Sequence, residues 1–172
     1  MDVNLRPIGA EDLEMCRRFL TEPGLIGNDW FGFRDAGQVA RRFAEDGYLA
    51  ADNGRLVVDV AGGQAAGIVS WIAGNYGGAA GFWEIGIVLL PEFRGRGIGW
   101  RAQALLTDYL FQHTPAQRIQ AGTQPENIAE QKSLVKAGFT LEGVIRACEF
   151  RAGAWRDGLL YSRLRHDPPP EY

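Results

Sequence analysis

The chain has 172 residues, 46% of them hydrophobic and 23% charged, with a formal net charge of −3 at pH 7. This length fits one domain with a sizeable core, and the acidic balance argues against a nucleic-acid-binding protein. No apolar run approaches the roughly 18 residues that would span a membrane, and the opening residues do not resemble a secretory signal. We therefore expect a cytoplasmic protein without nucleic-acid or membrane partners, either a monomer or a homodimer.

The first half of the chain alternates strand and helix patterns. Apolar periodicity predicts a strand over Val3–Arg6, a helix over Ala10–Leu20 and a shorter helix over Gln38–Glu45. Two further segments flank a Gly-Gly turn and indicate a β-hairpin, Leu56–Val60 and Ala65–Trp71.

The second half continues the alternation and ends in another hairpin. The expected elements are a strand over Glu84–Leu90, a helix over Ile98–Phe111, a strand over Arg118–Ala121, a helix over Ile128–Ala137, and a hairpin of Leu141–Phe150 with Trp155–Arg163. Such an order predicts an α/β domain whose sheet is mixed in direction. We expect residues 1–166 to form this single domain and residues 167–172, which include three prolines, to be a disordered tail.

The most informative segment lies between the fourth strand and the long helix. Its sequence places Gly95, Gly97 and Gly99 alternately with Arg94 and Arg96. Glycines leave successive backbone N–H groups open, the following helix presents its positive end, and the arginines add charge. The segment therefore predicts an anion site, most simply for a pyrophosphate.

Three glycine-rich phosphate loops compete for this segment. A Walker A loop needs Gly-Lys-Ser/Thr, whereas Gly99 is followed by Trp100 and Arg101, which excludes it. A dinucleotide fingerprint fits by letter, but it requires a glycine turn directly after the strand and an acidic residue ending the next strand. The third candidate is an acyl-CoA loop, and we favour it on the residues that follow.

Two motifs resemble the signatures of the GNAT superfamily of N-acetyltransferases. The spacing Arg94-x-x-Gly97-x-Gly99 resembles its acyl-CoA loop, Arg/Gln-x-x-Gly-x-Gly/Ala. Asn127, followed by a helix that ends in Lys-x-Gly-Phe, resembles the second GNAT signature. The C-terminal hairpin is similar to that of the Rim-type branch, the ribosomal-protein alanine acetyltransferases, through Gly143, Arg146, Gly153, Trp155 and Asp157.

The resemblance implies a GNAT fold, in which a mostly antiparallel central sheet has two splayed central strands that admit the pantetheine arm of acetyl-CoA. It also implies the residues that bind this acyl donor: Ile87, Val88, Leu89, Arg94, Gly95, Arg96, Gly97, Ile98, Gly99, Trp100 and Asn127. Asn127 is in addition a good helix N-cap, with Glu130 placed to complete a capping box.

The implied reaction is direct attack of a primary amine on the acetyl thioester, without a covalent enzyme intermediate and without a metal. A backbone N–H near Val88 would stabilise the oxyanion. Glu84 is the candidate base, and its alternative role is a rim carboxylate in an ion pair. Other GNAT enzymes carry a tyrosine acid where this chain has Leu134. A catalytically silent acyl-CoA-binding or regulatory module is therefore the alternative function.

The acceptor is left open between a protein N-terminal amine and a small-molecule amine. Trp30, Phe31 and Phe33 lie between the first two helices, where they would line an apolar slot or form core under a loop. Glu149 and Trp155 on the final hairpin are expected to form the opposite wall of the acceptor pocket.

Overall fold

The computed structural model describes residues 2–27, 30, 32–77 and 81–170. Its elements in chain order are β1 (Val3–Arg6), η1 (Ala10–Asp12), α1 (Leu13–Thr21), α2 (Pro23–Ile26), α3 (Gln38–Asp46), β2 (Asn53–Val60), β3 (Gln64–Asn75), β4 (Gly81–Leu89), η3 (Pro91–Phe93), α4 (Ile98–His113), β5 (Arg118–Thr123), α5 (Ile128–Lys136), β6 (Thr140–Arg151) and β7 (Ala154–Leu164).

The strands of the described residues form one sheet in the order β1-β2-β3-β4-β5-β7-β6. Neighbouring strands are antiparallel except β4 and β5, which run parallel and are joined through α4. A parallel pair requires such a crossover, because the chain must return to the same end of the sheet. The expected α/β fold with a mixed, mostly antiparallel sheet is confirmed.

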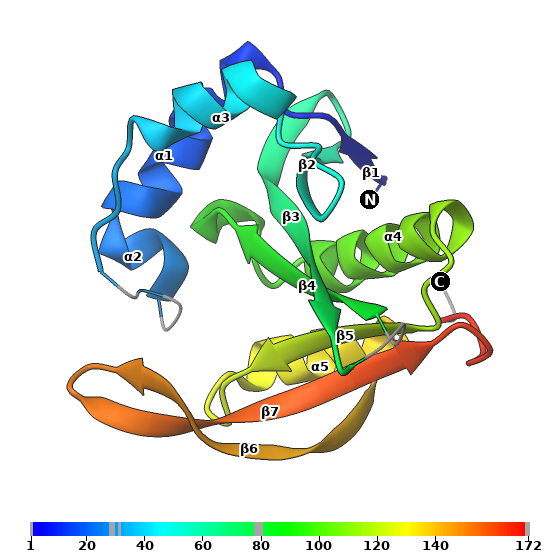
Figure 1. The fold of residues 1–172 in the computed structure, drawn as a ribbon. Helices are drawn as coiled ribbons and strands as arrows, with labels where there is room; N and C mark the ends of the chain where they lie inside the picture. The colour runs from blue at the N-terminus through cyan, green and yellow to red at the C-terminus, as the bar shows by residue number, and fades with distance from the viewer. Residues whose placement is uncertain (1, 28–29, 31, 78–80, 171–172) are drawn as a thin grey trace.

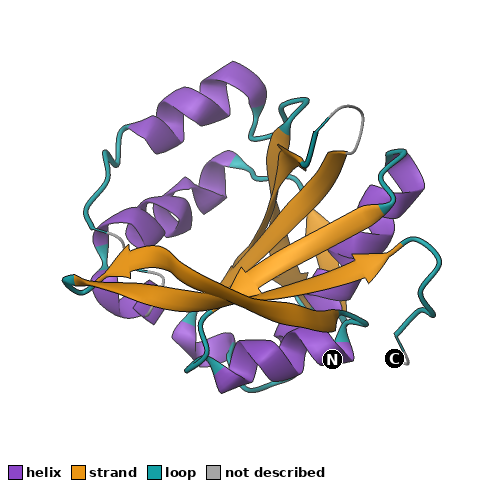
Figure 2. Cartoon of the chain, turned by 60° about the horizontal axis from the view of Figure 1, so that its bottom comes forward, coloured by secondary structure: helices purple, strands orange, loops and turns teal. Residues whose placement is uncertain are grey.

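Helices cover both faces of the sheet (Figures 1 and 2). Strand alternation explains this arrangement, because successive side chains of a strand point to opposite faces. In β2, Val57 packs in the cluster with α1 and α3, whereas Leu56 and Val58 pack in the cluster with α4. Two apolar cores therefore lie on opposite faces of the same strands.

The centre of the sheet opens between β4 and β5. Their pairing is limited to Trp83 with Ile119 and Glu84 with Gln120, although β4 continues to Leu89. On its other edge β4 pairs with β3 throughout. The backbone edge of β4 that follows Glu84 is therefore not covered by β5, which confirms the expected splayed central strands.

The backbone direction along this open edge follows from one hydrogen bond. Leu90 N–H donates to Ala66 C=O on the β3 side, at 2.9 Å. Peptide groups alternate sides along a strand, so the N–H of Val88 also faces β3. The N–H groups of Ile87 and Leu89 consequently face the opening.

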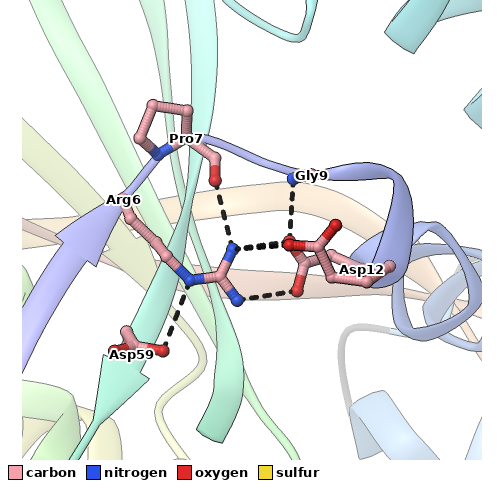
Figure 3. A network of polar contacts seen from close by, with 6 residues as sticks. Arg6, Pro7, Gly9, Asp12 and Asp59 are labelled. Carbon is pink, nitrogen blue, oxygen red and sulfur yellow. Dashed lines mark hydrogen bonds and ion pairs between the residues drawn. The ribbon is translucent and has the colours of Figure 1, made fainter. Parts of the chain in front are cut away.

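A buried ion-pair network fixes the start of the chain against the sheet (Figure 3). Arg6 of β1 donates to both carboxylate oxygens of Asp12, at 2.7 and 2.9 Å, and to Asp59 of β2 at 3.3 Å. Asp12 also accepts from Gly9 N–H at 2.8 Å and is 3% exposed. The network joins β1, η1 and β2 at the end of the sheet distant from the opening.

The structure extends several of the expected elements. β4 begins at Gly81, three residues before Glu84, and the short α2 and η3 have no counterpart among the sequence predictions. Both short helices start with proline, which is favourable at the first helical position, but four residues or fewer carry no readable periodicity. No helix of the described residues has the length and apolar character needed to cross a bilayer.

Candidate active site

Two cavities meet at the opening between β4 and β5. The larger, of about 1020 Å³, extends from the end of β4 along the glycine-rich loop and α5. The smaller, of about 310 Å³, lies between α1, the strands β2–β4 and the start of α5. Ile87, Val88 and Asn127 line both cavities. The open edge of β4 thus separates two compartments and is accessible from each.

The glycine-rich loop depends on backbone conformations that suit glycine. Gly95 and Gly97 have φ of 70° and 74°, in the left-handed region, and Gly97 caps the N-terminus of α4. A Cβ on Gly99 would lie 3.3 Å from Ser133 Oγ, so this glycine lets α4 and α5 approach closely. All three glycines line the larger cavity, which places the helix N-terminus and its open amides there.

The two arginines of the loop have different positions. Arg94 lines the larger cavity, but its guanidinium donates to Leu89 C=O at 2.9 Å and also to Leu25 C=O. It therefore holds α2, the end of β4 and the loop together. The exposed Arg96 lies 6.0 Å from the Phe93 ring and does not line the cavity.

The residues at the start of α4 divide between core and cavity. Ile98 is 1% exposed and packs in the core, so only its backbone can face a ligand. Trp100 lines the larger cavity, and the guanidinium of Arg101 lies 4.5 Å over its ring. Arg101 also donates to Gly97 C=O at 2.9 Å. Sequence reasoning did not assign Arg101, which fixes both the cap residue and the tryptophan.

Asn127 has the N-cap role that the sequence predicts. Its Oδ1 accepts from Glu130 N–H at 3.2 Å, and Asn127 lines both cavities. The Glu130 carboxylate accepts from the amide of Gln103, and Ser133 Oγ donates to the same amide's oxygen at 2.7 Å. Ser133 therefore brings a hydroxyl to the larger cavity, three residues beyond Glu130 on α5.

Glu84 lies at the outer rim of the smaller cavity rather than in its lining. It shares a sheet face with Gly86, which lines that cavity two residues further along β4. Gln120 Nε2 donates to Glu84 Oε2 at 2.9 Å, and Tyr76 Oη donates to Gln120 Oε1 at 2.6 Å. The carboxylate is exposed but oriented by a fixed amide.

The polar side chains of the smaller cavity that sequence reasoning missed include Arg55, Cys16 and Ser70. Burial raises the pKa of the Cys16 thiol to about 11, so the thiol is neutral near pH 7. Burial also lowers the pKa of the Arg55 guanidinium, which lies 5.3 Å from the Tyr48 ring. The sequence held a usable signal for Arg55. Strand alternation places it on the same face of β2 as the apolar Val57, so a charge is expected on an otherwise apolar face.

The family model described as "Acetyltransferase (GNAT) domain" matches residues 2–140. This chain belongs to the GNAT acetyltransferase family. A relative in Bacillus subtilis, named "Probable N-acetyltransferase YjcK", is 36% identical over 83 residues, which cover 48% of this chain and 46% of that protein. YnaD of the same organism, named an uncharacterized N-acetyltransferase, is 31% identical, over 49% of this chain and 50% of that protein. The chain thus spans about half the length of these two relatives.

Longer alignments connect this GNAT chain with spermidine acetyltransferases. The spermidine N(1)-acetyltransferase of Escherichia coli K12 is 26% identical over 95% of this chain and 87% of that protein. The Vibrio cholerae spermidine N-acetyltransferase, solved in complex with CoA and spermine, superposes with a TM-score of 0.83 at 21% identity, over 96% of each chain. These similarities support the GNAT fold, but they do not show the expected Rim-type branch.

The structure describes four of the five substrate-side residues expected from sequence in this GNAT domain, and one of them, Glu149, accepts from Gln124 Nε2 at 3.5 Å. Trp30 and Phe33 form an edge-to-face pair with ring centroids 5.2 Å apart, and Phe33 is 79% exposed. Trp155 is 65% exposed and packs on Phe150, and Glu149 lies near the hairpin tip. None of these four lines either cavity. Phe31 lies outside the described residues.

The larger cavity has room for an extended anionic ligand, and the smaller cavity has room for a compact ligand. Among the residues that the structure describes, no group of three or more His, Cys, Asp or Glu side chains is placed to bind a metal ion. Leu134, at the position of the family's tyrosine acid, is fully buried in the core. The described residues of the site supply backbone N–H donors, a carboxylate at the rim and the charge of Arg55.

Proposed function

We propose that the protein is an acetyl-CoA-dependent N-acetyltransferase that transfers the acetyl group directly to a primary amine in a ternary complex. One observation carries this function: the uncovered backbone edge of β4 leads, within one cavity, to the glycine-rich N-terminus of α4. An extended donor with amides at one end and a pyrophosphate at the other is complementary to these two features. The solved Vibrio cholerae relative, crystallised with CoA, supports the same donor.

The residues that line the larger cavity fit an acyl-CoA. Leu89 presents its backbone N–H toward the opening, where it can pair with a pantetheine amide. Gly95, Gly97 and Gly99 leave the loop amides uncovered for the pyrophosphate. We assign Arg94 and Arg101 to holding this loop in place, since both guanidinium groups bond to backbone carbonyls.

Two groups of the chain would promote transfer. The donor supplies an acetyl thioester, and we propose that Ile87 N–H, rather than Val88 N–H, stabilises its developing oxyanion, because Val88 N–H faces β3. Glu84 would accept the proton of the acceptor amine through water, since it lies at the cavity rim. The neutral Cys16 thiol argues against a covalent acetyl-enzyme intermediate.

We propose a small-molecule amine as the acceptor rather than a protein N-terminus of the Rim type. The acceptor-side cavity measures about 310 Å³, at the lower end of the size range of small-molecule sites. The spermidine acetyltransferases among the relatives act, by name, on a small-molecule amine. Both observations favour a compact acceptor.

The test of the donor is thermal unfolding in the presence of acetyl-CoA, CoA, NAD or ATP. A ligand at 100 times its dissociation constant stabilises the folded state by about 2.7 kcal/mol. We expect acetyl-CoA and CoA to raise the melting temperature and NAD and ATP to leave it unchanged. Stabilisation by NAD alone would instead support a dinucleotide site and contradict the proposal.

A catalytically silent acyl-CoA-binding module is the second candidate. It is favoured by Leu134, which leaves the usual acid position apolar, and by Glu84, which does not line the cavity. A thiol-release assay distinguishes the two candidates, because a silent module would bind acetyl-CoA without releasing CoA in the presence of any amine.

A further inference from the structure

A cross-strand row of three residues forms one wall of the smaller cavity. The register pairs Arg55 of β2 with Ser70 of β3, and Ser70 with Gly86 of β4. All three line the cavity and share the sheet face toward α1. The row therefore runs from a positive charge directly to the open edge of β4, where the acceptor amine must meet the acetyl group.

Gly86 keeps the path along this row open. A Cβ at this position would lie 3.2 Å from Ser70 Oγ, so any larger residue would displace the serine or fill the space between them. A substrate placed along the row can therefore contact the Ser70 hydroxyl while its amine reaches β4.

Among the residues that the structure describes, no salt bridge joins Arg55, which lines this cavity, to an Asp or Glu. Its guanidinium lies 5.3 Å from the Tyr48 ring, and after burial itself the nearby cations Arg42 and Arg34 lower its pKa further. Glu130 is the acidic residue among the described residues that line this cavity. It lies on α5, and its carboxylate accepts a hydrogen bond from the Gln103 amide. A partly buried cation without a counter-ion is an unfavourable arrangement that an anionic ligand would relieve.

We propose that the acceptor amine also carries a carboxylate, which Arg55 binds, and that the substrate class is a free amino acid or dipeptide. The inference rests on the proposed acetyltransferase function and names the substrate of the same site. Adjacent strands lie roughly 4.8 Å apart, so Arg55 and the open edge of β4 are separated by about 10 Å of backbone. The arginine side chain spans part of this distance, which leaves room for one or two residues.

The proposal separates this chain from the spermidine acetyltransferases that it resembles. A polyamine bears several positive charges and no anionic group. In the smaller cavity it would meet the positive charge of Arg55. Guanidinium and carboxylate groups, in contrast, form paired charge-assisted hydrogen bonds.

The experiment compares matched acceptors that differ only in the carboxylate: phenylalanine with phenethylamine, tyrosine with tyramine, and ornithine with putrescine. Thiol release from acetyl-CoA gives kcat/KM for each. A charge-assisted bond corresponds to roughly tenfold to a hundredfold in kcat/KM, and we expect the carboxylate-bearing member to be favoured by this factor. The Arg55→Gln variant should lose the preference through KM, and Arg55→Lys should keep part of it.

Arg42→Gln is the matched control. Arg42 lies 5.4 Å from the same Tyr48 ring as Arg55 but does not line the cavity. It should alter stability similarly and leave the carboxylate preference unchanged. Melting temperatures of all variants are compared first. If Arg55→Gln does not fold, the preference of the wild-type protein for carboxylate-bearing acceptors decides the proposal by itself.

Binding is measured in parallel, so that the outcome does not depend on finding the best amine. N-acetylphenylalanine and N-acetylphenethylamine are titrated into the CoA-bound protein, and only the former should stabilise it. Equal use or equal binding of the two members of each pair overturns the carboxylate proposal while leaving the acetyltransferase function intact. Failure of CoA itself to bind would instead overturn the proposed function.

Discussion

Glu84 is held at the cavity rim by the amide of Gln120, which is itself fixed by the Tyr76 hydroxyl. We predict that Glu84→Gln lowers turnover most at low pH, where the acceptor amine is protonated and needs a base. General base catalysis contributes about 10²–10⁴-fold, so a loss of about 10² at pH 6 should shrink as the amine deprotonates. The measurement is a pH–rate profile.

The control for Glu84 is Glu45→Gln, which changes an exposed glutamate of α3 outside both cavities. Its profile should match that of the wild type. A Glu84→Gln profile parallel to the wild type at every pH would remove Glu84 from the mechanism and leave it as a rim carboxylate.

Gly95 offers a second test at the residue scale. With φ of 70° and nothing near its missing Cβ, Gly95→Ala should cost about 1–2 kcal/mol of backbone strain. If loop amides hold the pyrophosphate, the variant should also raise the KM for acetyl-CoA about tenfold or more, through a weakened hydrogen bond to a charged group. Steady-state kinetics with acetyl-CoA as the varied substrate would show this.

Gly62→Ala provides the matched comparison for Gly95. Gly62 has φ of 92° and equally open surroundings, but it lies in the β2–β3 turn. A similar stability loss with an unchanged KM for acetyl-CoA is expected. Equal KM values for both variants would show that the loop amides do not contact the donor.

At the scale of elements, α5 begins at a residue with two separable roles. Asn127→Ala removes the cap acceptor of Glu130 N–H and should lower the free energy of unfolding by about 1 kcal/mol. Asn127→Asp retains the acceptor and should preserve stability. If Asn127 also contacts the donor, the added negative charge will raise the KM for acetyl-CoA. Unfolding curves and KM values together separate the cap from the binding role.

The network of Arg6, Asp12 and Asp59 governs how β1 is attached (Figure 3). Burial by itself raises the pKa of the Asp12 carboxyl, but hydrogen bonds from Arg6 and Gly9 lower it below its ordinary value. A depressed carboxyl pKa contributes stability above the unfolded value of about 3.9, and this contribution is lost as the pH falls through the folded pKa.

We therefore predict that Asp12→Asn lowers the free energy of unfolding by about 1–3 kcal/mol at pH 7, and that its deficit narrows below about pH 4. Urea unfolding at both pH values measures the two differences. If the difference in unfolding free energy between Asp12→Asn and the wild type stays constant with pH, the charge of the Asp12 carboxylate does not contribute to stability.

Most elements could be predicted from the sequence, because their periodicity is strong. The bounds of β1 agree with the prediction, and α3 and α4 differ only at their C-termini. Gly81 to Trp83 were missed because a glycine-rich loop precedes them, and only sheet pairing with β3 extends the strand. The α2 turn was missed because four residues show no helical period.

The donor side of the site was more predictable than the acceptor side. The loop glycines and Asn127 form a local motif, and the structure places them along one cavity. Arg55, Ser70 and Gly86 come from three strands, so only the sheet register brings them into one row. Trp30 and Phe33 were expected to line an apolar slot or to form core under a loop, and neither lines either cavity.

For the whole molecule, the splayed centre of the sheet explains why both cavities reach the same open edge of β4. β5 is held by β7 along its full length, and β4 by β3, so the opening between them is maintained by the outer strands. The proposed reaction would thus take place at the open edge of β4, a strand whose other edge is paired with β3 along its length (Figure 1).

Acetyl transfer itself is the most direct measurement. Purified protein is incubated with acetyl-CoA and the panel of amines, CoA thiol release is followed, and the product mass is determined. The account predicts amine-dependent thiol release matched by formation of an N-acetylated amine. Stabilisation by acetyl-CoA without acetylation of any amine at any pH would contradict it and identify a silent acyl-CoA-binding module.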